Sequence, residues 1–348
     1  MTLQQFIDDW NNDNDRLLVH TSGSTGAPKP LWVEKKRMEA SARTTCRFLG
    51  LKAGDTALLC MSLDYIAGKM MVVRSIVAGL QLISVKPSGH PLAGLASAPT
   101  FAAMVPMQVY NSLQVPQERD LLRKTKHLII GGGAIDEQLA KELRTFPNAV
   151  WSTYGMTETL SHIALRRLSG SEASEWYSPF DGVSISTDSE GCLIIDAPEV
   201  CKHPLITNDI ARLSSDGRQF RIIGRRDNVI CSGGIKLQIE EIEAILRPHL
   251  PHPFIITKVP DEKFGEAVVM LTTAPDLQPI RSLCSLHLSR FQIPKHFFTV
   301  PAIPTTETGK PARTEAARMA HDRVRRRGDE ETRRQENKNF EKTRHQKV

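Results

Sequence analysis

Short apolar runs alternate with longer amphipathic stretches along the first part of the chain. Residues 66–78 and 135–146 carry apolar side chains at helical spacing. The apolar runs around them are short and bounded by polar residues or glycine, as buried strands are. We expect strands at 56–62, 80–85, 127–132 and 149–155. This alternation predicts a largely parallel sheet covered by helices.

The pattern changes in the second half of the chain, where short strands and tight turns predict a small antiparallel unit. A helix is expected from about Gln238, with acidic residues in its first turn, and another over 279–291. We therefore predict an α/β N-terminal domain, residues 1–226, in which a parallel sheet with helices is joined by the antiparallel unit. A smaller α+β domain, residues 227–320, and a charged tail, residues 321–348, are expected to follow.

The basic character of the sequence lies mainly in this tail. The chain of 348 residues has a formal net charge of +6, and its last 28 residues, from His321, hold ten Lys or Arg and six Asp or Glu. A segment this polar cannot bury a core, so we expect a frayed helix or disorder. Nucleic-acid binding through the tail is the alternative. The whole chain is 40% apolar and 24% charged, as soluble globular proteins are.

Cysteine usage and the N-terminus both indicate a reducing compartment. The six cysteines are scattered without a C-x-x-C pair, which predicts reduced thiols rather than a zinc site or a disulfide frame. Residues 1–16 are acidic and lack the apolar core of a secretory signal. No apolar run approaches the roughly 18 residues that span a bilayer. We expect a cytoplasmic protein that has no membrane partner.

Residues 21–29, TSGSTGAPK, form a polar loop between two apolar segments that are expected to pair as a hairpin. Its glycines allow backbone N–H groups to approach an anion closely, and its hydroxyls and lysine add donors and positive charge. The loop therefore predicts a phosphate site, with a flexible linker as the alternative. The candidate phosphate-binding residues are Thr21, Ser22, Gly23, Ser24, Thr25, Gly26 and Lys29.

Two further polar turns follow predicted strands, at 131–134 and 154–158. Because ligands bind at the carboxyl ends of parallel strands, we expect these turns and the polar loop to share one site. Tyr154 offers a flat ring for stacking on a base, or it fills the core. Glu158 offers a carboxylate suited to Mg²⁺, or it is a surface charge.

These motifs, in this order, resemble those of the adenylate-forming superfamily, which contains acyl- and aryl-CoA ligases, peptide-synthetase adenylation domains and luciferases. The polar loop is similar to the superfamily's phosphate-binding signature, IIGGGA (129–134) to its adenine-side strand end, and YGMTE (154–158) to its adenine and magnesium motif. The resemblance covers about residues 18–315. It continues through TNDIARL (207–213), GRRDNVICSGGIKLQIEEIE (224–243) and PTTETGKPAR (304–313).

The resemblance implies a role for each matching position. It implies Mg·ATP as a ligand, with Thr157 at the α-phosphate and Glu158 holding the metal. Lys310 is implied as the catalytic lysine that bridges the attacking carboxylate and the α-phosphate, where negative charge gathers. The residues implied to contact adenine and ribose are Gly132, Gly133, Ala134, Tyr154, Gly155, Asp209 and Arg225.

The implied reaction has two steps. A carboxylate first reacts with Mg·ATP to give an acyl-adenylate and pyrophosphate, and the thiol of CoA then attacks the adenylate and releases AMP. Between the steps the small domain is implied to rotate about Asp227. Ser232, Gly233 and Gly234 are implied to line the passage of the pantetheine arm, although two adjacent glycines also suit an ordinary turn.

The sequence gives the least information about which carboxylic acid is the substrate. Thr159, His162 and Arg166 follow the magnesium motif, where the acyl pocket of the superfamily usually begins. His162 and Arg166 are four residues apart, so they share a side of a helix or a strand and could bind a second carboxylate. A solvated polar face is the alternative. The whole chain resembles the short o-succinylbenzoate–CoA ligases of menaquinone biosynthesis, carried by YGMTETLSHIALRRLSG and SGGIKLQIEEIE.

Two departures from the superfamily pattern stand out. Only 20 residues precede Thr21, so we expect a reduced N-terminal subdomain, and the ribose loop reads T-N-D in place of the commoner T-G-D. Other functions stay open: a ligase for another aryl or acyl acid, an enzyme that loads a carrier protein, or a degenerate module that only binds ATP or acyl-AMP. A homodimer is an expectation from the superfamily alone.

Overall fold

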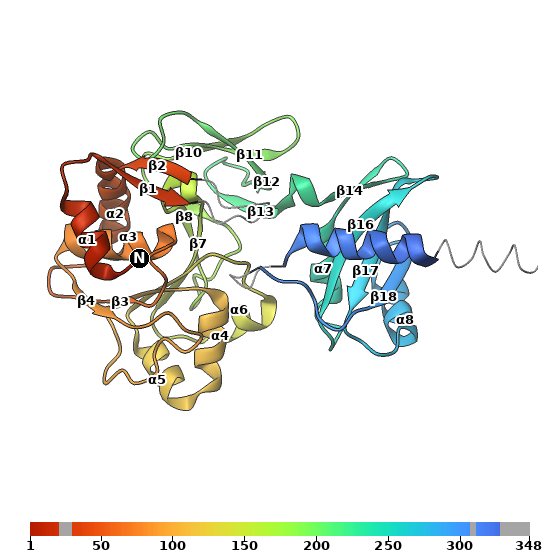
Figure 1. Cartoon of the computed structure of the whole chain (residues 1–348), viewed down its shortest axis with the longest axis horizontal. Coiled ribbons are helices and arrows are strands. Elements are labelled where there is room, and N and C mark those ends of the chain that lie inside the picture. The colour runs from red at the N-terminus through yellow and green to blue at the C-terminus, as the bar shows by residue number, and fades with distance from the viewer. Residues whose placement is uncertain (21–29, 307–310, 328–348) are drawn as a thin grey trace, which may run out of the picture. The chain divides into compact units, whose positions relative to one another are not determined.

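The computed structural model describes residues 1–20, 30–306 and 311–327. The chain divides into two compact units (Figure 1). Each unit has hydrophobic cores of its own. Unit 1 contains Met1–Thr207 and Ala211–Ile222. Unit 2 contains Asn208–Ile210 and the chain from Ile223 onwards. The predicted domain boundaries stay a prediction, although the chain passes into unit 2 close to the expected hinge residue Asp227.

Unit 1 is built on a seven-stranded sheet with the order β4-β3-β5-β6-β7-β8-β9. The strands β4, β3, β5, β6 and β7 pair in parallel, whereas β8 and β9 extend the sheet in antiparallel pairing. The bounds are β3 (Thr56–Leu59), β4 (Gln81–Ser84), β5 (Phe101–Met104), β6 (His127–Ile130), β7 (Ala149–Gly155), β8 (His162–Arg167) and β9 (Ser178–Pro179).

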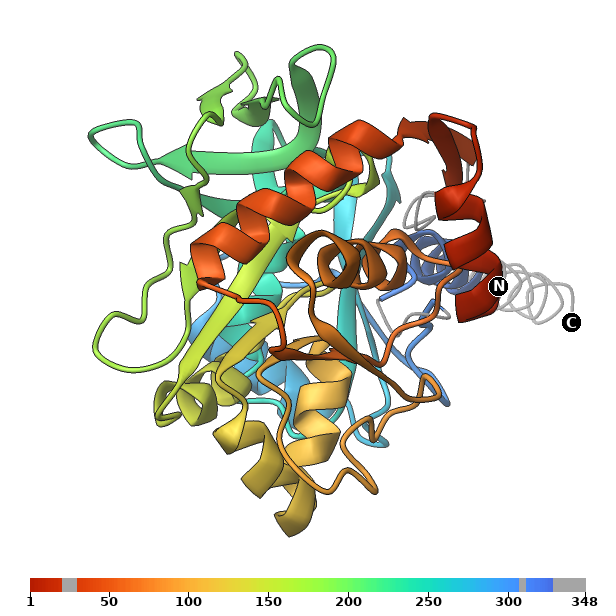
Figure 2. The ribbon, with the colours of Figure 1, turned by 90° about the vertical axis from the view of Figure 1, so that its left-hand side faces the viewer.

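Helices cover both faces of this sheet because its central strands are apolar on both sides. Ala57, Leu59 and Phe101 pack in one core with α2 and α3, the face seen in Figure 2. Leu58 and Ala102 pack in the other core, with α4, α5 and α6. The bounds are α2 (Lys35–Leu49), α3 (Ile66–Ala78), α4 (Pro106–Gln114), α5 (Pro116–Lys124) and α6 (Glu137–Arg144).

Three smaller pieces complete unit 1. The helix α1 (Leu3–Asn11) adds Phe6 and Trp10 to the first core. The segments on either side of the polar loop form the expected hairpin, β1 (Arg16–His20) with β2 (Pro30–Glu34), in antiparallel register with Leu17 opposite Val33. A four-stranded sheet has the order β10-β11-β12-β13, and β12 carries the chain into unit 2. Its strands are β10 (Ser184–Thr187), β11 (Cys192–Asp196), β12 (Leu205–Leu213) and β13 (Phe220–Arg225).

Unit 2 is a five-stranded sheet covered by helices on both faces. The helices α7 and α8 share one core with Ile230 and Met270, and the helix over residues 313–327 packs Ala316 and Ala320 against the opposite face. The elements are the 3₁₀ turn η2 (Arg226–Asn228), β14 (Val229–Ser232), β15 (Ile235–Gln238), α7 (Ile239–Leu246), β16 (Phe254–Asp261), β17 (Gly265–Thr272), α8 (Gln278–His287) and β18 (His296–Thr299).

The predicted fold class is confirmed: a larger α/β part with a parallel sheet and an antiparallel unit, and a smaller α+β part. Several predicted strands were too long, because apolar residues such as Cys60 remain fully buried after the chain has left the sheet. The boundary of the tail at residue 320 does not coincide with a helix end, since the last described helix continues to residue 327 and packs Val324.

The cysteines are free thiols, as expected, and only Cys231 among them is exposed. Within the part of the chain that the structure describes, no helix has the length and apolar character needed to cross a bilayer.

Candidate active site

The predicted adenine-side residues lie on two neighbouring strands. The parallel strands β6 and β7 place Ile130 opposite Ser152, so the turn 131–134 follows one strand beside the end of the other. Gly132 has a φ of +78°, which favours glycine. A Cβ on Gly131 would lie 2.3 Å from Oγ1 of Thr153. The structure thus brings Gly132, Gly133 and Ala134 to the same edge of the sheet as Tyr154 and Gly155.

The ring of Tyr154 is half-buried and already packs against other aromatic side chains. Its centroid lies 5.0 Å from that of Phe220 at an interplanar angle of 78°, and 5.8 Å from that of Tyr177. These edge-on and tilted contacts hold the ring in place, but they do not show what lies against its other face. Both interpretations of Tyr154, stacking on a base and packing in the core, therefore stay open.

The magnesium motif forms a 3₁₀ turn, η1 (Thr157–Thr159), directly after β7. Thr157 is buried, whereas Glu158 is exposed and forms no ion pair with any described residue. The backbone carbonyl of Glu158 accepts a hydrogen bond from the Cys201 thiol at 3.4 Å. An exposed, unpaired carboxylate fits Mg²⁺, which is usually held by one or two carboxylates together with phosphate oxygens and water.

Backbone strain marks the residues that follow η1. Leu160 has φ +64° and ψ −36°, and it is the one non-glycine residue with positive φ in the described ranges. The amide of Ser161 donates to the carbonyl of Thr159 at 2.7 Å, which closes a three-residue γ-turn around Leu160. Such strained turns persist only where the surroundings hold them, and they cluster at functional sites.

A buried cation lies beside this strained turn. Arg74, from the apolar helix α3, is 2% exposed, and its Nη2 donates to Oγ of Ser161 at 2.5 Å. No described Asp or Glu pairs with Arg74, and its buried Nε has no hydrogen-bond partner. Burial lowers the pKa of Arg74 to about 10, so the guanidinium remains charged at neutral pH. The sequence interpretation missed Arg74, because the surrounding apolar residues predict only a buried helix.

The predicted pair of cations, His162 and Arg166, is not formed. His162 is buried, and desolvation together with the charge of Arg74 lowers its pKa well below the usual 6.5, so the ring is neutral. Arg166 stacks on the ring of Tyr177 at 5.3 Å instead. Both residues lie on β8, but their contacts are separate. His162 is therefore not the expected cation, and the assignment of Thr159, His162 and Arg166 to the acyl pocket stays a prediction.

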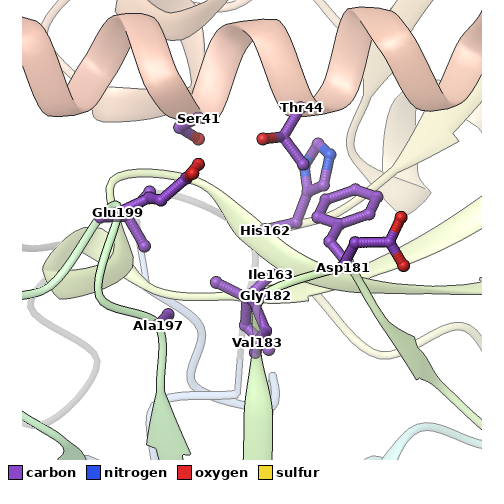
Figure 3. Close-up of a pocket in the computed structure, with 11 residues that line it drawn as sticks. Ser41, Thr44, His162, Ile163, Asp181, Gly182, Val183, Ala197 and Glu199 are labelled. Atoms are coloured by element: carbon purple, nitrogen blue, oxygen red, sulfur yellow. The ribbon is translucent and has the colours of Figure 1, made fainter.

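A small pocket lies beside His162 (Figure 3). Ser41 and Thr44 of α2 line one side, and the loops that carry Asp181 and Glu199 line the other. Its volume of about 30 Å³ suits one or two water molecules. Its small volume and its two carboxylates do not suit an anionic aromatic acid.

The predicted ribose-binding residues meet within unit 2. Nη1 of Arg225 lies 3.1 Å from Oδ1 of Asp209, and Nη2 lies 3.2 Å from Oδ2 of Asp227. Arg226 also takes part, since its Nη2 donates to Oδ1 of Asn208 at 2.6 Å. The guanidinium of Arg225 thus orients the carboxylate of Asp209, which can accept hydrogen bonds from two hydroxyl groups.

The predicted CoA-binding residues occupy the turn between β14 and β15. Gly233 and Gly234 both have positive φ, +59° and +81°, which is the backbone of a tight hairpin turn. The amide of Gly233 donates to the carbonyl of Phe264 at 2.8 Å, which fixes the turn against the start of β17. The ordinary-turn interpretation is satisfied, and the role in CoA binding stays a prediction.

Two groups of predicted residues lie outside the described ranges. They are Lys310 and the phosphate-loop residues Thr21, Ser22, Gly23, Ser24, Thr25, Gly26 and Lys29. The chain on either side of Lys310 is described: Thr305 pairs with Pro311, and the amide of Ala312 donates to the carbonyl of Pro304 at 2.9 Å. Arg313 forms a two-pronged ion pair with Glu243, at 2.6 and 2.7 Å.

Comparison with known proteins agrees with this geometry. Residues 5–187 match the family model described as AMP-binding enzyme. A 2-succinylbenzoate–CoA ligase of Geobacillus sp. (strain WCH70) is 24% identical over 341 residues, 88% of this chain and 69% of that protein.

Solved structures show the same fold. An acyl-CoA synthetase (AMP-forming)/AMP-acid ligase II-like protein from Dyadobacter fermentans DSM 18053 is 34% identical, with a TM-score of 0.61 over 88% of this chain and 90% of that chain. An O-succinylbenzoate coenzyme A synthetase from Bacillus subtilis, solved with ATP and magnesium ion, is 22% identical, with a TM-score of 0.71 over 86% of this chain and 69% of that chain.

Proposed function

The chain belongs to the AMP-binding enzyme family, and from that premise we propose that it joins o-succinylbenzoate to CoA at the expense of ATP. The predicted superfamily and the predicted class of enzyme, an acid–CoA ligase, are confirmed. The choice of o-succinylbenzoate is the proposal. It is supported by the name of the similar Geobacillus ligase and by one feature of the site, the buried Arg74.

Arg74 carries the argument for a dicarboxylate. A buried charge without a counter-ion is costly, so such a group is normally paired or hydrogen-bonded. Arg74 has a hydroxyl partner in Ser161, an unpaired Nε–H, and no acidic partner among the described residues. A substrate carboxylate that is not being activated would supply the missing negative charge. A guanidinium is also the cation that recognises planar carboxylates best, because its donors form a fork.

In the first step, the carboxylate of the acid attacks the α-phosphate of ATP, and pyrophosphate leaves. Asp209, held by Arg225, accepts hydrogen bonds from the ribose hydroxyls, and the turn 131–134 with Tyr154 borders the base. Glu158 would hold Mg²⁺, which neutralises charge on the phosphates. Lys310 and the phosphate loop donate to the phosphate oxygens as negative charge gathers on the pentacoordinate phosphate.

In the second step, the CoA thiolate attacks the acyl carbon of the adenylate, and AMP leaves. The new carbon–sulfur bond replaces the mixed-anhydride bond, so atoms and charge balance without another reactant. The turn with Ser232, Gly233 and Gly234 borders the pantetheine arm. Asp227, which lies in η2 where the chain leaves β13, is the hinge that allows unit 2 to serve both steps.

The decisive experiment is ATP-dependent pyrophosphate release with o-succinylbenzoate, run beside benzoate, succinate and acetate, with and without CoA. We expect release with o-succinylbenzoate and many turnovers once CoA is added. Release with another acid alone would retain the enzyme class and reject the substrate. A burst of adenylate without turnover on CoA would favour delivery to a carrier protein, and no release with any acid would favour a binding module.

The Lys310→Ala variant tests whether the activity depends on the assigned lysine. Loss of one preorganised donor to the transition state costs about 10²–10³ in rate, so pyrophosphate release should fall by that factor. Lys124→Ala is a matched control, since Lys124 is exposed in the last turn of α5 and borders no assigned ligand. Equal rates for Lys310→Ala and the wild type would contradict the assignment.

A further inference from the structure

A chain of hydrogen bonds connects Arg74 to helix α2. It runs from Arg74 through Ser161 and His162 to Thr45, over atoms that are buried or half-buried. We propose that His162 and Thr45 are positioning residues, which hold the guanidinium of Arg74 in the orientation that receives the second carboxylate of the substrate. This inference rests on the proposed function, and it adds residues that touch neither the substrate nor ATP.

The direction of every proton in this chain follows from its far end. Thr45 Oγ1 lies 3.1 Å from the carbonyl oxygen of Ser41, which can only accept, so the single hydroxyl proton of Thr45 points there. Thr45 must then accept from Nε2 of His162, 3.1 Å away. The proton of the neutral imidazole is therefore on Nε2, and Nδ1 is an acceptor.

The proton directions between His162 and Arg74 follow in the same way. Nδ1 of His162 accepts the hydroxyl proton of Ser161 at 3.2 Å. The oxygen of Ser161 is then left with lone pairs only, and it accepts from Nη2 of Arg74. With the Thr45 proton on the Ser41 carbonyl, every bond in the chain runs in one direction, and the oxygen of Ser161 is presented to Arg74 as an acceptor. The guanidinium is held by one end, while its Nε–H remains without a partner.

Two further features hold this chain of hydrogen bonds in one arrangement. The strained γ-turn at Leu160 directly precedes Ser161 and His162 and sets the direction of both side chains. The imidazole is also kept neutral by burial and by Arg74 itself, and Phe180 packs 5.5 Å from its ring. A protonated ring would put a second proton on Nδ1, facing Ser161, and would remove the acceptor from the chain.

Arg74 itself cannot test this inference, because its loss removes the carboxylate site as well. Thr45→Val removes the end of the chain with little change of volume, and His162→Asn removes its middle. Thr45→Ser retains the hydroxyl and should behave as the wild type does. Thr44→Val is the matched control, since Thr44 lies on the same helix and bonds only to the carbonyl of Ala40 among the described residues.

The measurement is kcat/KM for o-succinylbenzoate and for two analogues that each lack one carboxylate, 3-benzoylpropionate and 2-butanoylbenzoate. We expect Thr45→Val and His162→Asn to lower kcat/KM for the dicarboxylate about tenfold, while the better monocarboxylate analogue changes less than about twofold. Thr45→Ser and Thr44→Val should leave the ratio of the two values at its wild-type level.

The outcomes separate the two claims. A wild type that does not prefer the dicarboxylate would reject the proposed function. A wild type that prefers it, with the same preference in Thr45→Val and His162→Asn, would overturn the positioning role and leave the proposed function intact. Equal losses for the dicarboxylate and the monocarboxylate would also overturn the positioning role, because they indicate a purely structural contribution. If His162→Asn does not fold, the comparison of Thr45→Val with Thr45→Ser still tests the positioning role.

Discussion

In the proposed function, the choice of acid depends on Arg74. In Arg74→Met the aliphatic volume remains and the charge is lost, so a second substrate carboxylate would be buried without a partner. We expect kcat/KM for o-succinylbenzoate to fall at least 10²-fold, in line with the roughly 3 kcal/mol that such an unpaired charge costs. Steady-state kinetics with the monocarboxylate analogues should show little change. A uniform loss for all acids would contradict the role.

Arg74→Lys refines this prediction. Lysine keeps the charge but replaces the planar fork by a point donor that has to reach Ser161 as well. We expect a loss smaller than that of Arg74→Met and a preference for the dicarboxylate that persists. Identical kinetics for the two variants would mean that geometry alone, rather than charge, sets the specificity.

His162 should make the stability of the protein sensitive to mild acid. Its pKa in the folded state is lowered by burial and by Arg74, so below the usual value of 6.5 the unfolded chain binds a proton that the folded chain does not. The free energy of unfolding therefore falls as the pH drops below 6.5, by about 1.4 kcal/mol for each pH unit. Urea unfolding at pH 7.5 and 5.5 measures this change in the free energy of unfolding.

The His162→Asn variant supplies the control for this pH effect. Asparagine does not titrate, so the variant should lose less stability than the wild type over the same interval. If the wild type and the variant show the same change in stability, the pH dependence comes from other titratable groups. His127, whose pKa is also lowered by burial and by Lys126, is the first candidate among those.

At the scale of elements, the approach of β8 to the end of β7 depends on Gly155. The register shifts between Tyr154 and Gly155, and a Cβ on Gly155 would lie 2.2 Å from the carbonyl oxygen of Ser161 and 2.5 Å from the Cα of His162. Gly155→Ala must push the strained turn outward, because both neighbours are backbone atoms. We expect a loss of about 2 kcal/mol or more in the free energy of unfolding.

Gly133→Ala is the comparison for Gly155→Ala. A Cβ on Gly133 would meet only the ring of Pro106, at 3.5 and 3.6 Å, which is ordinary contact. Its stability should stay within about 0.5 kcal/mol of the wild type. Denaturant unfolding of both variants tests the prediction, and a stable Gly155→Ala protein would show that the turn at Leu160 can move.

At the scale of the whole molecule, the proposed function assigns a hinge to Asp227, so we expect backbone angles there to change between the two steps. Asp227→Pro fixes φ at one value and should block that change. We expect pyrophosphate release to remain near the wild-type rate and thioester formation to fall at least tenfold. Single-turnover assays of each half-reaction separate the two effects.

Asp227→Ala shows whether the backbone or the carboxylate is responsible. It removes the contact with Nη2 of Arg225 but leaves the backbone free. Both half-reactions should then proceed at rates close to those of the wild type. If Asp227→Ala fails in the second step as severely as Asp227→Pro does, the ion pair with Arg225, rather than rotation of the backbone, is what matters.

Much of the architecture follows from local pattern alone. The helical spacing of residues 66–78 coincides with α3, and the run at 149–155 coincides with β7, because these segments satisfy their backbone bonds and bury their side chains in the way that periodicity implies. The order of the motifs was enough to identify the enzyme class. Strand ends were predicted poorly, since apolar residues beyond the sheet are buried by helices and loops.

The sequence by itself determined most of the elements and the class of enzyme, because both depend on short contiguous segments of the chain. Only the tertiary structure revealed the buried, unpaired guanidinium of Arg74 on which the proposed substrate depends. Arg74 and Ser161 are 87 residues apart, and Thr45 and His162 are 117 apart. Their charges and protons depend on burial and on each other, and burial is a property of the folded chain. Local pattern made His162 a cation, and desolvation beside Arg74 makes it neutral.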